Sequence, residues 1–316
     1  MVKAAKRLLD RTSRARLATA TALVLVLLSL YQARIHHLDD RLYYYISTHP
    51  LLQSADAESV SLGDYSVVVE AKAVAGVDNN LSGLTFDPDR NLLWAVTNGP
   101  NELFALNTSG EVIQRHALDG FHDVEAVSYL GDGQLVLSEE RRQTLVIVNA
   151  PQPGETLDRA DYKGLTIDYG EGDNDGYEGL AYDLSGDRLF VAKERKPIRL
   201  LEITGLRASM SGDFSLNIQD RSALVREKVF ATDLSSVVFD QRTGHLLLLS
   251  DESKLLIEIG DDSEVVGFSS LAAGAAGLLQ DIPQAEGVTI DANGSIYVVS
   301  EPNLFYSFER SVSQKP

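Results

Sequence analysis

The chain has 316 residues, no cysteine, and 46 acidic against 28 basic residues, so its formal net charge at pH 7 is −18. The absence of cysteine excludes a disulfide-stabilised scaffold and a bacterial lipoprotein anchor, and a chain of this length buries a large core without cross-links. The negative charge argues against nucleic-acid binding, because such a domain would repel the phosphate backbone. Cations or basic partners fit it better, although solubility alone accounts for most of these charges.

Residues 1–33 have the pattern of a membrane anchor or a signal peptide. Six basic residues and one acidic residue give the first 16 positions a charge of +5, which leaves −23 on the rest, and an uncharged run covers 17–33. A basic segment before an apolar run is typical of both classes. The run is near the lower length limit for crossing a bilayer. No convincing small-x-small cleavage site precedes Arg34, so we favour an uncleaved single-pass anchor in the inner membrane, with the remainder in a bacterial periplasm. Secretion after signal cleavage is the alternative.

Residues 34–64 are predicted to form a tether, with a short juxtamembrane helix around 39–45. A seven-residue phrase then recurs five times: LSGLTFD from Leu81, VEAVSYL from Val124, YEGLAYD from Tyr177, LSSVVFD from Leu234 and AEGVTID from Ala285. Turn residues and two further apolar segments follow each copy, and the copies lie 43 to 57 residues apart. Short β-rich segments at this interval are typical of four-stranded propeller blades. We therefore predict an all-β fold with a single β-propeller over 65–309 and a tail over 310–316.

Outer strands are predicted at 111–118, 164–169, 214–218 and 264–271, but the last blade has none after Phe308. The unassigned strand at 65–74 completes that blade in the simplest arrangement, so the ring closes by pairing N-terminal with C-terminal segments and leaves no free edge. This arrangement has five blades. The alternative is six, if the insert at 206–230 contains a degenerate blade; otherwise we expect at most a short helix near 220–227.

Two sets of side chains are predicted to meet at one mouth of the central channel. The second phrase position begins the innermost strand of each blade, and the polar break after the antiparallel second strand lies at the same end. The first ring is Ser82, Glu125, Glu178, Ser235 and Glu286, and the second ring is Asn98, Glu140, Glu194, Glu252 and Glu301. Two residues before the first ring, Asp123 and Asp233 either add oxygen atoms or serve as turn residues.

Clustered carboxylates repel one another, so a protein protonates them, pairs them with bases or binds a cation. Glu125, Glu178 and Glu286 are the predicted metal ligands, with hydrogen bonding to backbone amides of neighbouring blades as the alternative. Oxygen ligands without cysteine or a histidine cluster favour Ca²⁺ over zinc. For the second ring, rim ion pairs are the alternative to a direct role, since bases are adjacent in the sequence: Arg141, Arg142, Lys193, Arg195 and Lys254.

The ordered motifs SGLTFD, DVEAVSYLGD, SEER, YEGLAYD, KERKPI, QAEGVTID and VSEPNLFYSF resemble the SdiA-regulated family over about residues 65–309. The resemblance implies an exported or membrane-tethered propeller related to NHL-repeat proteins, calcium binding, and no established biochemical activity. The leader and the insert at 206–230 lie outside the shared pattern.

Two functions remain open. The first is a membrane-tethered binding module with Ca²⁺ at the channel mouth, which engages a small molecule, a glycan or an envelope protein. The second is a metal-dependent hydrolase of lactones or phosphoesters, since the E-G-[LV]-x-[YI]-D phrase is similar to the metal-ligating strand opening of gluconolactonase-type and paraoxonase-type propellers. A hydrolase also needs a general base. His122, beside Asp123, is the one histidine expected near the mouth, and we favour a plain loop position for it over a catalytic role. The sequence nominates no catalytic residue.

Overall fold

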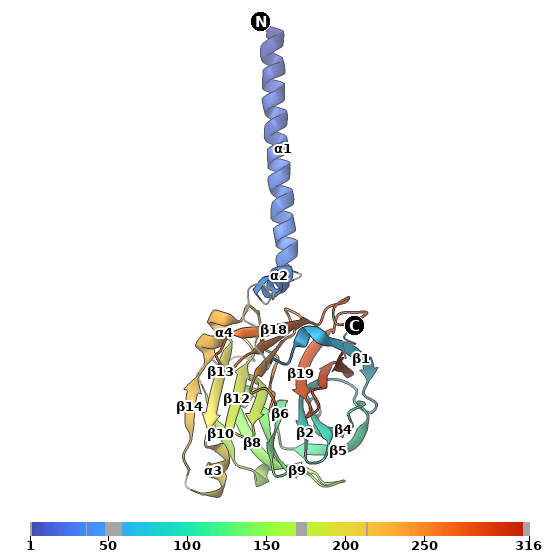
Figure 1. The fold of residues 1–316 in the computed structure, drawn as a ribbon, viewed down its shortest axis with the longest axis vertical. Coiled ribbons are helices and arrows are strands. Elements are labelled where there is room, and N and C mark those ends of the chain that lie inside the picture. Colours follow the sequence, from blue (N-terminus) through green and yellow to red (C-terminus); the bar gives the residue numbers. More distant parts are fainter. Residues whose placement is uncertain (1, 36, 48–58, 169–175, 213, 312–316) are drawn as a thin grey trace, which may run out of the picture.

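The computed structural model describes residues 2–35, 37–47, 59–168, 176–212 and 214–311, so parts of the predicted tether (48–58) and tail (312–316) lie outside the described residues. A long helix, α1 (Val2–Ile35), stands away from the rest of the protein and is followed by a short helix, α2 (Leu38–Ser47), which lies against a β-propeller (Figure 1). The segment Arg16–Ile35 of α1 has a mean hydropathy of 1.5 and is not buried by any other part of the chain.

The propeller has five blades, numbered here in chain order, and each is an antiparallel sheet built outward from the channel. Blade 1 contains β2 (Leu81–Asp87), β3 (Leu92–Asn98), β4 (Asn101–Leu106) and β5 (Val112–Asp119), extended by the parallel β9 (Leu157–Asp158). Blade 2 contains β6 (Val124–Gly131), β7 (Gln134–Glu139), β8 (Thr144–Asn149) and β10 (Gly164–Thr166). Blade 3 contains β11 (Tyr177–Asp183), β12 (Arg188–Lys193), β13 (Arg199–Thr204) and β14 (Asn217–Asp220).

Blade 4 contains β15 (Ser236–Phe239), β16 (Leu246–Ser250), β17 (Leu255–Ile259) and β18 (Val265–Ser270). Blade 5 contains β19 (Gln284–Ile290), β20 (Ile296–Glu301), β21 (Leu304–Arg310) and, as its outer strand, β1 (Tyr65–Ala73). The pairing of β1 with β21 runs from Tyr65 opposite Arg310 to Ala73 opposite Leu304. The predicted closure by N-terminal and C-terminal strands is confirmed. It protects β21, which would otherwise be a free edge.

The insert at 206–230 contains no sixth blade. It forms α3 (Leu206–Ser211), the outer strand β14 and α4 (Ser222–Lys228). The six-bladed alternative is therefore wrong, because the only strand of this segment in the described residues pairs with β13 in blade 3. The helix predicted near 220–227 corresponds to α4, whereas α3 was not predicted. The outer strands also differ in their bounds, since β14 begins at Asn217 and β10 ends at Thr166.

Neighbouring blades cover both faces of the middle strands. All five residues of β16, Leu246–Ser250, are buried, which explains why that strand reads as a continuous apolar run without polar alternation. The aspartate that closes the phrase has a structural role. Asp87 is fully buried and accepts hydrogen bonds from the backbone N–H groups of Asp89 and Arg90 and from Trp94 Nε1, at 3.0 to 3.1 Å. It therefore stabilises the turn that follows β2.

Candidate metal site at the channel mouth

The glutamates of the repeated phrase occupy β-bulges. The β6–β7 pairing passes from Val124 directly to Ala126, so Glu125 has no partner opposite it. The same interruption surrounds Glu178 in β11 and Glu286 in β19. A bulge leaves one residue unpaired and redirects its side chain, and bulges are common beside functional sites. All three glutamate side chains are half-buried. The recurring bulge gives the first ring its common position.

The residue after each first-ring position is small: Gly83, Ala126, Gly179, Ser236 and Gly287. A Cβ atom on Gly83 would lie only 2.7 Å from Ala126 Cα and 2.8 Å from the carbonyl oxygen of Glu125. Such a contact between adjacent inner strands is too short for any side chain. Small residues at this position therefore let the five inner strands approach one another, which brings the first-ring side chains together.

Three carboxylates from blade 2 form the tightest acidic cluster in the described part of the chain. Asp123, Glu125 and Glu140 each contribute one oxygen atom, and these atoms lie within 4.8 Å of one another. Asp123 immediately precedes β6 and has a left-handed backbone with φ of 55°. Glu140 begins the 3₁₀ turn η2 (Glu140–Arg142) directly after β7. Asp123 and Glu125 therefore come from the start of β6, and Glu140 follows the end of β7, so the cluster lies at one end of this strand pair.

Neighbouring blades orient two members of this cluster. Asn98 Nδ2 of blade 1 donates a short hydrogen bond to Glu125 Oε1. The backbone N–H of Gly176, just before blade 3, donates to Glu140 Oε1 at 2.8 Å. Each carboxylate thus has one oxygen held by a donor from a neighbouring blade. Asn98 and Glu140 were both predicted in the second ring, and the structure brings them to Glu125.

Asp123 keeps an acceptor atom without a donor. Its Oδ2 is buried, and Arg141 Nε lies 2.7 Å away, but the described residues give this oxygen no partner with hydrogen-bond geometry. The arginine therefore supplies charge without satisfying the oxygen as an acceptor. A buried, unsatisfied carboxylate oxygen costs free energy. A cation between Asp123, Glu125 and Glu140 would remove that cost, and an all-oxygen donor set suits Ca²⁺.

Burial and mutual repulsion raise the pKa values of the carboxyl groups that face the channel. Burial, with the charges of Glu125 and Asp123 adding to it, raises the pKa of Glu140 to about 8. Burial also raises the pKa of Glu286 to about 8, and it raises the pKa of Glu125 above its usual range. The pKa of Glu178 is raised well above normal by burial first and then by surrounding glutamates, including Glu194 and Glu286. Ionising all the carboxyl groups at the mouth therefore costs free energy unless a counter-ion is bound.

Glu178 and Glu286 do not belong to the tight cluster. They lie on the same bulged position in blades 3 and 5, and the pKa of each responds to glutamate charges elsewhere in the mouth. Their assignment as metal ligands together with Glu125 stays a prediction.

The rest of the second ring behaves differently from Glu140. Arg195 lies 2.5 Å from Glu194 and 2.9 Å from Glu252, so one guanidinium joins blades 3 and 4. These two glutamates follow the ion-pair alternative. Glu301 is half-buried, and burial raises its pKa. Lys254 pairs instead with Asp251 at 2.6 Å.

Asp233, the other predicted additional ligand, organises a loop. Its carboxylate accepts the backbone N–H groups of Asp251 at 3.0 Å and Glu252 at 3.2 Å, together with the hydroxyl of Ser250. Burial raises its pKa to about 6. Both of its oxygens already have donors, which matches the turn-residue alternative.

Sequence reasoning missed Glu139, which is fully buried beside the cluster. It accepts the backbone N–H of His122 at 3.1 Å and pairs with Arg159 at 2.9 Å. The paired glutamates of SEERR were a signal, but a sequence does not show which of two adjacent residues faces the mouth. The side chain of His122 is exposed.

Comparison with known proteins decides the family. The model of the SdiA-regulated family matches residues 57–309, which is most of the chain. The chain belongs to the SdiA-regulated family. The resemblance noted from the sequence is therefore confirmed.

Several solved propellers are similar in fold to this SdiA-regulated family member. A gluconolactonase from Xanthomonas campestris, XC5397, shows 12% identity and a TM-score of 0.49, covering 80% of this chain and 93% of its own. A luciferin-regenerating enzyme shows 14% identity and a TM-score of 0.49, covering 78% and 96%. The calcium-binding protein regucalcin from Agrobacterium tumefaciens shows 12% identity and a TM-score of 0.46, covering 77% and 92%.

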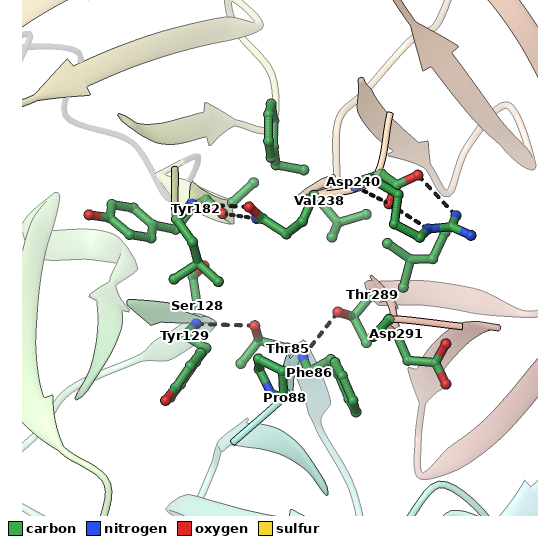
Figure 2. A pocket seen from close by; sticks show the side chains of 17 residues that line it. Thr85, Phe86, Pro88, Ser128, Tyr129, Tyr182, Val238, Asp240, Thr289 and Asp291 are labelled. Carbon is green, nitrogen blue, oxygen red and sulfur yellow. Dashed lines mark hydrogen bonds and ion pairs between the residues drawn. The ribbon is translucent and has the colours of Figure 1, made fainter. Parts of the chain in front are cut away.

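The SdiA-regulated propeller also has a cavity of about 270 Å³ at the other mouth, where the inner strands end (Figure 2). Its polar groups join neighbouring blades. Thr85 Oγ1 accepts the backbone N–H of Tyr129, and Thr289 Oγ1 accepts that of Phe86, at 3.1 and 3.0 Å. Gln241 Nε2 donates to the carbonyl of Tyr182 at 2.6 Å. These hydrogen bonds join blade 1 to blades 2 and 5, and blade 3 to blade 4. The clustered carboxylates lie at the opposite end of the channel.

Proposed function

We propose that this protein is a membrane-tethered β-propeller binding module, exported to the periplasm, whose acidic channel mouth binds Ca²⁺. The observation that carries the proposal is the cluster of Asp123, Glu125 and Glu140, whose oxygens lie within 4.8 Å of one another. Two oxygens on opposite sides of a Ca²⁺ ion, with bonds of ~2.4 Å, lie about 4.8 Å apart. The buried Asp123 Oδ2 has no hydrogen-bond donor in the described structure, which supports the same assignment.

The membrane tether is supported by the way α1 ends. Arg34, in its last turn, binds Asp39 at 2.8 Å and Asp40 at 3.1 Å. Asp40 in turn contacts the propeller through Ser253. A signal sequence has similar length and hydropathy, but the contacts of Arg34 with a docked helix favour a segment that is retained.

Calorimetric titration of the full-length protein in detergent tests the cation site. We expect Ca²⁺ binding that Glu140→Gln weakens at least roughly ten-fold, because a charged ligand is lost. Asp132→Asn is the matched control, since that carboxylate is exposed at the opposite mouth. Absence of binding to the unsubstituted protein would refute the site.

A panel of lactones and phosphoesters then separates a binding module from a metal-dependent hydrolase. A hydrolase needs a general base beside its metal, but the three carboxylates of the cluster are the proposed metal ligands and the side chain of His122 is exposed. We expect no turnover across the panel. Turnover that requires Ca²⁺ and disappears in Glu140→Gln would establish the hydrolase instead.

A further inference from the structure

The fifth position of the repeated phrase forms the wall of the cavity at the mouth opposite the carboxylates. One residue comes from each blade, and the set is Thr85, Ser128, Ala181, Val238 and Thr289. Figure 2 shows the labelled members of this set around one central space. Exposed turn residues, including Pro88, Gln241 and Ala292, surround the opening. The cavity is therefore reached from solvent at this end of the channel.

The wall has a polar half and an apolar half. The hydroxyl-bearing residues come from blades 5, 1 and 2, which are neighbours around the ring, whereas blades 3 and 4 contribute Ala181 and Val238. The sixth phrase position adds mainly aromatic surface, from Phe86, Tyr129, Tyr182, Phe239 and Ile290. The hydroxyl groups of the two tyrosines bind turn aspartates, Asp89 and Asp187. The tyrosines therefore contribute no free hydroxyl to the wall.

Three hydroxyl groups on the polar half can donate to a bound molecule. Thr85 Oγ1 and Thr289 Oγ1 each accept a backbone N–H of the next blade, but a hydroxyl also has one hydrogen to donate. In the described part of the chain neither of these hydrogens meets an acceptor. Ser128, which is 4% exposed, makes no side-chain hydrogen bond with any residue that the structure describes. Its hydroxyl is therefore the donor most available to a ligand.

The charged side chains at the cavity are already paired. Asp240 is buried and binds the guanidinium of Arg242 through both of its oxygens, at 3.0 and 2.9 Å. Asp291 accepts the hydroxyl of Tyr297 at 2.9 Å and two backbone N–H groups of its own turn. Because a further, unpaired charge buried beside them would cost free energy, the cavity favours a neutral ligand.

Water alone suits only half of this cavity. A buried water needs about two to four polar partners, which the hydroxyl groups supply on one side and the apolar half does not. Replacing weakly held water by an apolar group increases the affinity of a ligand. A cavity of ~150 Å³ holds one benzene molecule, so a cavity of about 270 Å³ holds roughly ten non-hydrogen atoms.

We propose that this cavity binds a neutral small molecule of roughly ten non-hydrogen atoms, with a carbonyl or ether oxygen on one edge and an apolar remainder. The oxygen accepts a hydrogen bond from Ser128, and the apolar remainder lies against Ala181 and Val238. The site shares no residue with the cluster of Asp123, Glu125 and Glu140. It is therefore tested separately from calcium binding, and neither result decides the other.

Three probes of nearly equal size test the chemistry of the ligand. Acetophenone is neutral and has a carbonyl oxygen, α-methylstyrene has a CH₂ group in place of that oxygen, and benzoate is charged. Equilibrium dialysis of the full-length protein, with the same detergent concentration on both sides, cancels the uptake of probe into micelles.

Three variants locate the bound probe. Ser128→Ala removes a hydroxyl that binds no described residue, and Val238→Thr keeps the shape of the apolar half but adds a hydroxyl. Ser109→Ala is the matched control, because this serine is exposed in the turn between β4 and β5. The Tm of each variant confirms that it is folded.

We expect acetophenone to bind the unsubstituted protein with a Kd below ~5 mM, and benzoate to bind at least roughly ten-fold more weakly because its charge would be unpaired. Ser128→Ala should weaken acetophenone binding about two- to ten-fold, the effect of one neutral hydrogen bond, without weakening the binding of α-methylstyrene. Val238→Thr should weaken the binding of both neutral probes at least about two-fold, and Ser109→Ala should change neither.

Two results would overturn the site. The first is the absence of acetophenone binding to the unsubstituted protein. The second is binding of both neutral probes that neither Ser128→Ala nor Val238→Thr changes, since the probes would then lie elsewhere. The comparison of acetophenone with benzoate needs no variant, so it decides the preference for a neutral ligand even where a substitution prevents folding.

Discussion

The backbone N–H of Gly176 donates a 2.8 Å hydrogen bond to Glu140 Oε1, which joins blade 3 to the carboxylate cluster of blade 2. Because this bond occupies one oxygen of Glu140, the other remains available to the cluster. The bond also lowers the energy of the charged carboxylate, but burial outweighs it and the pKa still rises to about 8. The cluster is therefore arranged by backbone contacts between blades and is incompletely neutralised.

Calcium is expected to stabilise the folded protein. At a Ca²⁺ concentration 100 times the Kd, binding to the native state alone contributes about 2.7 kcal/mol to the free energy of unfolding. For a domain of this size that corresponds to an increase in Tm of about 5–10 °C. Differential scanning calorimetry with Ca²⁺, Mg²⁺ or a chelator measures the effect. An unchanged Tm in saturating Ca²⁺ would contradict the site.

Substitutions distinguish the tight cluster from the three phrase glutamates. We expect Glu125→Gln and Glu140→Gln each to weaken Ca²⁺ binding at least roughly ten-fold, and Glu178→Gln to weaken it less than about five-fold through the loss of a more distant charge. Titration calorimetry provides the Kd values. Equal, large losses for Glu178→Gln and Glu286→Gln would instead place the ion on the channel axis, among the three predicted ligands.

Stability is expected to depend on pH in a direction set by the buried glutamates. The folded-state pKa values of Glu140 and Glu286 are about 8, above the value of ~4.3 for an unfolded chain. These groups therefore favour folding fully below pH ~4 and disfavour it increasingly as the pH rises through 8. In chelator, Glu140→Gln should be more stable than the unsubstituted protein at pH 8.5, with the difference shrinking as the pH falls and disappearing below pH ~4.

The same titration makes calcium binding dependent on pH. Since Ca²⁺ binds the ionised carboxylates, binding releases protons, and its affinity should rise between pH 6 and 9. Titrations in two buffers of different ionisation enthalpy measure the released protons. A Ca²⁺ affinity that stays constant over this range would mean that Glu140 is not a ligand.

Gly176 is predicted to tolerate no side chain. A Cβ atom there would lie 2.3 Å from the carbonyl oxygen of Glu140 and 2.7 Å from its Cγ. Gly176→Ala should therefore lower the free energy of unfolding by about 1–3 kcal/mol and weaken Ca²⁺ binding as Glu140 is displaced. Gly63→Ala is the control, because a Cβ atom at Gly63 meets no atom within 4 Å. Urea unfolding compares the two, and equal stability would show that Glu140 is not held by this contact.

The blade count was accessible from the sequence because each blade repeats the same phrase, with a small residue after its second position and with turn residues and two apolar segments after it. Glu125 and Asp123 were recognised from their places around one recurring phrase, and Glu140 from the alignment of the polar breaks. The grouping of these three was not accessible, since it depends on the left-handed backbone of Asp123 and on the 3₁₀ turn that begins at Glu140.

The docking of α2 could not be predicted for a different reason. Asp40 and Tyr44 belong to a single ten-residue helix outside the repeat, and their partners Ser253 and Phe230 lie 213 and 186 residues away along the chain. A short helix was expected there from local pattern alone. Its buried contacts exist only once blade 4 has formed the surface that receives them.

A crystal structure of the protein grown with Ca²⁺ tests the central claim most directly. We expect one strong peak bonded to oxygens of Asp123, Glu125 and Glu140 at about 2.3–2.6 Å, with water completing the coordination. A channel mouth without a peak at saturating Ca²⁺, or an ion bound away from these three carboxylates, would contradict the account.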